Sequence, residues 1–200
     1  MQYLALGIRC LIGTVFIVSS ISKVAGRSAF GQFVASVRGL RPPTALPVVP
    51  TAVVVVAAEF AVCALLCANL VVVGYALAVA LLVGFSVAIA GALARGVRAS
   101  CRCFGSSGAL LGRHHIARNA GLALVAACGL VVGHPAGGVQ PGGVVLAVLA
   151  GLILGGLVAV LDDIVDLFRP LTDGAAPPRR ASVTTPPAAG VESGQIVKSQ

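Results

Sequence analysis

The sequence contains very little charge, no tryptophan and none of the motifs of the common enzyme classes. Only 10% of its 200 residues are charged, whereas 58% are hydrophobic and the mean hydropathy is +1.03. A soluble domain carries roughly a quarter of charged residues, so this composition excludes an ordinary soluble protein. The sequence has no Ser-His-Asp arrangement, phosphate-binding loop or haem CxxCH motif, which leaves hydrolase, nucleotide-binding and cytochrome functions without support.

The charge that is present is mostly positive, with a formal net charge of +8. Such a balance is common in nucleic-acid-binding proteins, where basic residues gather on one surface together with aromatic residues. Here the basic residues lie between long apolar runs instead. We therefore predict no nucleic-acid partner and relate the basic residues to membrane topology.

Five apolar segments are long enough, or nearly so, to cross the hydrocarbon core of a bilayer, which requires about 20 residues. None of them alternates between apolar and polar residues, so helices and not a closed barrel must satisfy the backbone in lipid. The first segment contains Arg9 and has no basic residue ahead of it, which favours a retained helix over a signal peptide. The sequence predicts an all-α, polytopic membrane bundle of about five spans, at residues 4–22, 48–68, 71–94, 116–133 and 143–161.

The basic residues predict the orientation of these spans. With five crossings, the segments after the first, third and fifth spans share one side, and they hold 13 of the 14 Lys and Arg residues. The connections near Asn69 and at 134–143 hold none. By the positive-inside rule we expect a multi-pass protein of the plasma membrane whose N-terminus lies outside. The loop between the third and fourth spans and the C-terminal tail are then cytoplasmic.

Two segments lie outside the predicted spans. Residues 28–39 place Phe30, Phe33, Val34 and Val37 on one helical face, which predicts an amphipathic helix along the cytoplasmic interface. From Thr172 the composition changes to Pro, Ala, Ser, Thr and Gly, which is typical of a disordered tail. We divide the chain into a transmembrane domain at 1–170 and a disordered tail at 171–200.

The segment CRCFG, at residues 101–105, places two cysteines one residue apart in the loop between the third and fourth spans. A disulfide between them would close a small, strained ring, and strain makes a disulfide easier to reduce. Arg102 would favour the thiolate, which is the attacking species. The segment therefore suits a reactive disulfide better than a structural one.

Two other interpretations of this loop stay open. One is a pair of unreactive loop cysteines. The other is a metal site, because two histidines follow on the same loop and thiolates with imidazoles make tetrahedral sites, although the spacing differs from the usual paired CxxC framework. The ligands of such a site would be Cys101, Cys103, His114 and His115.

Glu59 is an ionisable residue near the centre of the second span, where a charge is costly and usually faces a partner or a cavity. Arg9 lies about two turns into the first span, at a depth that predicts a pair with Glu59. The carboxylate could carry protons or contact a cofactor, since thiol oxidation releases protons, or the pair could fix helix packing. Both roles stay open. We expect Lys23, at the end of the first span, to extend towards the interface.

The remaining four cysteines, Cys10, Cys63, Cys67 and Cys128, fall within predicted spans, where an isolated cysteine usually acts as a small hydrophobe. Cys63 and Cys67 are four residues apart on the helical face that Glu59 also occupies. On a straight helix their Cα atoms lie near the upper distance limit for a disulfide. If one of the four is redox-active, its partner should come from another helix.

Several separated sequence elements occur in the same order as in a known family. They are RCLIGTVFIVSSISKV near the start, Glu59, FSVAIAGALARG, RGVRASCRCFG and the ARN that opens the fourth span. Over roughly residues 5–130 the chain resembles the MauE family, methylamine-utilisation membrane proteins grouped with DoxX-like redox-associated proteins. The resemblance implies a four-helix core, to which the fifth span is an addition. The family usually has a glycine between the two cysteines, where this chain has Arg102.

The resemblance implies a role in disulfide handling. MauE-type proteins are associated with the maturation of methylamine dehydrogenase, which has a disulfide-rich small subunit, alongside a thioredoxin-like partner. Cys101 and Cys103 would be the redox pair. A quinone is an electron acceptor open to a membrane oxidant, but no residue specifies one. The alternative function is a non-catalytic membrane scaffold, or a maturation subunit that binds metal through the Cys/His loop.

Overall fold

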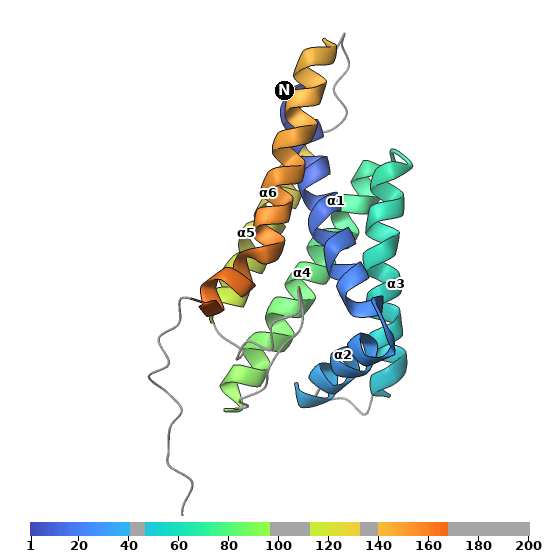
Figure 1. The fold of residues 1–200 in the computed structure, drawn as a ribbon, viewed down its shortest axis with the longest axis vertical. Coiled ribbons are helices and arrows are strands. Elements are labelled where there is room, and N and C mark those ends of the chain that lie inside the picture. Colours follow the sequence, from blue (N-terminus) through green and yellow to red (C-terminus); the bar gives the residue numbers. More distant parts are fainter. Residues whose placement is uncertain (41–46, 97–112, 133–139, 168–200) are drawn as a thin grey trace, which may run out of the picture. The chain divides into compact units, whose positions relative to one another are not determined.

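The computed structural model describes residues 1–40, 47–96, 113–132 and 140–167, and these residues form helices and no strand. Figure 1 shows the six α-helices of this part of the chain. In chain order they are α1 (Gln2–Val24), α2 (Arg27–Gly39), α3 (Val48–Cys67), α4 (Val71–Ala94), α5 (Arg113–Val132) and α6 (Pro141–Leu167).

All helices except α2 are long and apolar enough to cross a membrane, which confirms the prediction of five spans. Each of the five begins within three residues of its predicted start. Local residue choices explain where the helices stop. Gly26, between α1 and α2, has a φ of 156° that side chains rarely adopt. Asn69 has a φ of 63° at the α3–α4 turn, and asparagine tolerates this left-handed conformation better than most residues.

Helix α1 packs against α2, α3, α5 and α6, and α4 packs against α3 and α5. Successive long helices run in opposite directions, so the bundle has two ends (Figure 1). We call one the Asn69 end, where α1, α4 and α6 begin and α3 and α5 finish. The other is the α2 end, where α3 and α5 begin. The main apolar core includes Ile12, Phe16, Val62, Leu82 and Leu122.

Helix α2 is short, and it packs against α3 through the apolar face predicted from the sequence. Phe33 is only 3% exposed and contacts Ala52 and Val56 of α3. Phe30, Val34 and Val37 are partly buried around the same contact. The predicted helix at 28–39 is therefore confirmed.

Helix α6 approaches α1 closely because glycines occupy the contact. A Cβ atom at Gly151 would lie 2.6 Å from the carbonyl oxygen of Gly7 and 2.7 Å from the Cβ of Cys10. A Cβ atom at Gly155 would lie 2.8 Å from the Cβ of Thr14. Small residues of this kind let two membrane helices bring their backbones together, which is how helices associate in lipid.

Candidate functional site

An ion pair between α1 and α3 lies inside the bundle. The ammonium nitrogen of Lys23 is 2.6 Å and 2.9 Å from the two carboxylate oxygens of Glu59. Ser19 joins the pair, since Lys23 Nζ donates to its hydroxyl at 2.6 Å and that hydroxyl lies 3.2 Å from Glu59 Oε1. Lys23 is 2% exposed and Glu59 is fully buried. The two buried charges thus neutralise each other.

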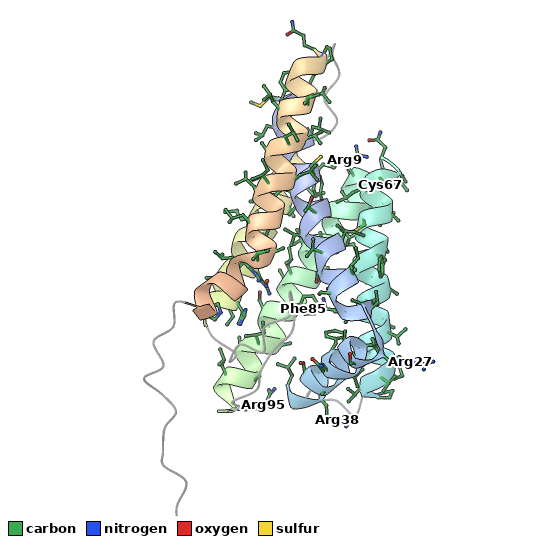
Figure 2. All side chains as sticks on the ribbon, viewed as in Figure 1. Arg9, Arg27, Arg38, Cys67, Phe85 and Arg95 are labelled. Atoms are coloured by element: carbon green, nitrogen blue, oxygen red, sulfur yellow. The ribbon has the colours of Figure 1, made fainter. Side chains whose placement is uncertain are left out.

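Two phenylalanines from other helices cover the Lys23 ammonium. The ring centroid of Phe33 in α2 is 5.2 Å from Lys23 Nζ, and that of Phe85 in α4 is 5.9 Å away. Figure 2 labels Phe85, which α4 carries. Both distances allow a cation–π attraction, which is stronger at a desolvated site. Four helices therefore meet around one buried charge.

The structure corrects two sequence predictions here. Arg9 does not pair with Glu59, because Lys23 holds that position. Arg9 instead donates to the carbonyl oxygens of Leu66 and Cys67 and, at 2.9 Å, to Asn69 Oδ1. Lys23 does not extend to the interface, since its ammonium is buried in the bundle.

Arg9 binds there because the last backbone carbonyl groups of α3 need hydrogen-bond donors. The last carbonyls of a helix have no partner within the helix, and a basic side chain nearby can satisfy them. Arg9 lies beside these carbonyls, and Cys67 is eight residues from Glu59, about 12 Å along the helix axis. One sequence feature does point to Lys23 as the partner of Glu59. Ser19 and Lys23 are four residues apart and so lie on one face of α1.

Buried polar groups concentrate towards the α2 end. Among the described residues, the buried polar or charged side chains are those of Ser19, Ser20, Lys23, Glu59, His115 and Asn119. They come from the last turns of α1, the middle of α3 and the first turns of α5. Asn119 is fully buried, and its amide nitrogen and oxygen have no hydrogen-bond partner in the described part of the chain. The buried polar side chains therefore lie in this half of the bundle, beside apolar core residues such as Ile89 and Ala92.

The predicted redox pair Cys101 and Cys103, with Arg102, lies outside the described residues. In the sequence these residues connect the end of α4 to the start of α5, and both of these helix ends lie at the α2 end (Figure 1). His114 and His115 lie in the first turn of α5 with ring centroids 3.9 Å apart, and His115 is 3% exposed. In the described ranges no three potential ligands gather into a metal site.

The other four cysteines carry free thiols. Cys10 in α1 and Cys67 in α3 both lie towards the Asn69 end. The thiol of Cys63 is 3.8 Å from the carbonyl oxygen of Gly13 in α1. Cys128 is exposed on α5. Cys10 and Cys67 therefore lie at the end away from the attachment points of the CRCFG loop.

Comparison with known proteins identifies the family. Neither the curated proteins nor the solved structures contain a match to this chain. The family model described as methylamine utilisation protein MauE matches residues 1–132, which include α1 to α5, the Lys23–Glu59 pair and both cysteines of the CRCFG segment. Helix α6 lies beyond the matched residues. With five helices able to span a bilayer, this multi-pass membrane protein belongs to the MauE family.

Proposed function

We propose that this protein is a membrane thiol–disulfide redox component in which Cys101 and Cys103 form and break a disulfide. The observation that carries the proposal is the presence of this closely spaced pair within the residues that match the MauE family. A disulfide across one intervening residue is strained, and strained disulfides are the exchangeable ones. The role is disulfide formation during maturation of an exported protein of the methylamine dehydrogenase type.

The chemistry is an exchange with a thioredoxin-like partner. A thiolate of the partner attacks the Cys101–Cys103 disulfide, displaces one sulfur as a thiolate and forms a mixed disulfide. The second thiolate of the partner then attacks the mixed disulfide, which leaves the partner oxidised and both cysteines reduced. Two electrons pass from the partner to the pair, and the two protons of the partner's thiols end on Cys101 and Cys103. Arg102 supports the step by stabilising the thiolate form of its neighbours.

Glu59 acts in packing in this proposal, with Lys23 and not Arg9 as its partner. The short contacts of the carboxylate with Lys23 and its contact with Ser19 support this role. Glu59 is also the only acidic residue in residues 1–161, so no other carboxylate there can neutralise Lys23. The pair connects α1 to α3 beneath the two phenylalanines of α2 and α4.

We place the α2 end in the cytoplasm. The exposed residues Arg27, Arg38 and Arg95 lie at this end (Figure 2), whereas Arg9 near the opposite end donates to helix carbonyls. Basic residues concentrate on the cytoplasmic side of membrane proteins. The CRCFG loop is then cytoplasmic, and electrons from an exported substrate must cross the membrane to reach it.

The function is tested by disulfide exchange in lipid vesicles. The oxidised protein is mixed with reduced thioredoxin, and the loss of thioredoxin thiols is followed over time. Cys101→Ser, Cys103→Ser and the double variant should each abolish exchange. Cys128→Ser, at an exposed position of α5, is the matched control and should exchange at the wild-type rate. Unchanged exchange in the double variant would contradict the proposal and assign the exchange to other cysteines, whereas no exchange by the wild type would favour a scaffold. Metal analysis with and without His114 and His115 separates the metal-binding alternative.

The sidedness is tested with a membrane-impermeant maleimide. In a variant that lacks the other four cysteines, Cys101 and Cys103 should resist labelling in intact reduced cells and react once the cells are opened. Labelling in intact cells would reverse the orientation and place the pair in direct contact with an external partner.

A further inference from the structure

A groove of about 400 Å³ lies between α2, α3 and α4, close to the Lys23–Glu59 pair. Helix α2 is held against α3 by Phe33, and the hydrogen bond from Arg95 Nη2 to the carbonyl oxygen of Leu40, at 2.8 Å, connects the end of α2 to α4. Between these two contacts the helices stand apart. Phe33 and Phe85, whose rings cover Lys23, also line the groove.

The lining of the groove is almost entirely apolar, and small residues on α4 keep it open. Ala80, Gly84 and Ala88 face it, and a Cβ atom at Gly84 would meet no other atom within 4 Å. Apolar atoms that enter such a groove gain dispersion contacts with the side chains that line it. In a bilayer, the apolar material at hand to fill such a gap is a hydrocarbon chain.

Positive charge lies at the α2 end of the groove. Arg95 lines the groove and is exposed, and one of its five N–H donors is used by Leu40. Arg38, next to the groove residue Val37, is exposed at the same end (Figure 2). The only carboxylate whose side chain the structure describes is that of Glu59, which is buried with Lys23. No described carboxylate therefore competes for Arg95.

We propose that this groove binds an anionic phospholipid, with one acyl chain between α2 and α4 and the phosphate on Arg95. A guanidinium forms strong, charge-assisted hydrogen bonds with phosphate oxygens. Basic pockets between membrane helices on the cytoplasmic side are known sites for anionic head groups. An isoprenoid quinone has a similar tail but a neutral head, which would gain less from Arg95 than a phosphate does. The proposal does not depend on the thiol chemistry.

The test uses the full chain in detergent micelles and two lipids with identical acyl chains, phosphatidylglycerol and phosphatidylcholine. Native mass spectrometry measures the fraction of protein that retains each lipid, and the thermal unfolding midpoint is followed as lipid is added. The wild type should bind phosphatidylglycerol about tenfold more tightly, because the choline cation of phosphatidylcholine offsets its phosphate charge and is repelled by Arg95 and Arg38.

Two substitutions separate the acyl chain from the head group. Gly84→Leu fills the groove with a side chain and should abolish retention of both lipids. Its control is Gly121→Leu, at an exposed position of α5 that also has open space and does not line the groove. Arg95→Gln should remove the preference for phosphatidylglycerol while a chain is still retained. Its control is Arg27→Gln, at an exposed position away from the groove.

Three results would overturn the proposal. The first is equal binding of the two lipids by the wild type. The second is retention of phosphatidylglycerol by Gly84→Leu at the wild-type level. The third is a co-purified quinone that Gly84→Leu displaces while the phospholipid stays bound. If Gly84→Leu fails to fold, the Arg95→Gln comparison alone decides, because an unchanged lipid preference in that variant contradicts the assignment of the phosphate.

Discussion

The two halves of the bundle satisfy their polar groups in different ways. In the half next to the α2 end, polar side chains from α1, α3 and α5 are buried, and Lys23 and Glu59 neutralise each other. In the half next to the Asn69 end, the core is apolar, glycines bring α1 and α6 together, and Arg9 satisfies the carbonyls at the end of α3. The same helix, α1, thus contributes a buried charge at one end and a helix cap at the other.

This difference separates two kinds of stabilisation. Glycine contacts and helix caps hold helices in place without burying a charged side chain. A buried ion pair is weak evidence for stability by itself, yet removing one partner leaves an uncompensated charge in a low dielectric. The half with this pair is also the half to which the CRCFG loop is attached. We therefore expect substitutions in the two halves to differ in size and in whether they can be rescued.

The largest effect should come from breaking the Lys23–Glu59 pair. Lys23→Met or Glu59→Gln alone should lower the free energy of unfolding by about 3 kcal/mol or more, because each leaves a buried group without its partner. The double variant should recover much of that loss. Unfolding by denaturing detergent in micelles measures all three variants. Losses that simply add in the double variant would show that the two residues do not act as a pair.

A smaller effect should come from Gly151→Ala at the α1–α6 contact. The added methyl would meet the Gly7 carbonyl and the Cβ of Cys10, so the helices must separate, at a cost of about 2 kcal/mol. The matched control is Gly156→Ala on the same helix, where an added Cβ meets nothing within 4 Å. The control should be neutral or slightly stabilising, since alanine is the better helix former. Equal losses in both variants would argue against the close contact.

The smallest effect should come from Arg9→Met, which removes the cap at the end of α3. The loss should be about 1 kcal/mol, because the site is partly exposed and water can replace the donor. Arg9→Lys should keep part of the stability. Hydrogen exchange at the last turn of α3 is the local readout. Faster hydrogen exchange near Glu59 in Arg9→Met, with no change at Leu66, would favour an Arg9–Glu59 pair and contradict the role of Arg9 as a cap.

The fold was predictable from the sequence because lipid imposes a simple rule. Uninterrupted apolar runs of about 20 residues must be helices, and the boundaries followed from proline, glycine and asparagine near the turns. The face of α2 also followed from the spacing of Phe30, Phe33 and Val37. The partner of Glu59 did not, because it depends on the relative height of α1 and α3. Hydropathy gives the ends of each helix but not which turns of two helices lie side by side.

The candidate site was predictable in residue type but not in its surroundings. Two cysteines one residue apart indicate thiol chemistry from their spacing alone. No local pattern indicates that Phe33 and Phe85, from two other helices, cover the Lys23 ammonium. Nor could the sequence show that Asn119 is fully buried, since ARN at the start of α5 also fits an interfacial turn. Both features depend on contacts between helices that are far apart in the sequence.

The most direct test of the proposed function is the redox state of Cys101 and Cys103 in the membrane-embedded protein. Thiols are trapped by alkylation after oxidant or reductant treatment, and the protein is digested with trypsin, which cleaves after Arg102, between the two cysteines. The proposal predicts that peptides 99–102 and 103–113 are joined by a disulfide after oxidation and are separate and alkylated after reduction. Cys128, exposed on α5, should be alkylated in both cases. Alkylated thiols at both Cys101 and Cys103 under both conditions would contradict the account.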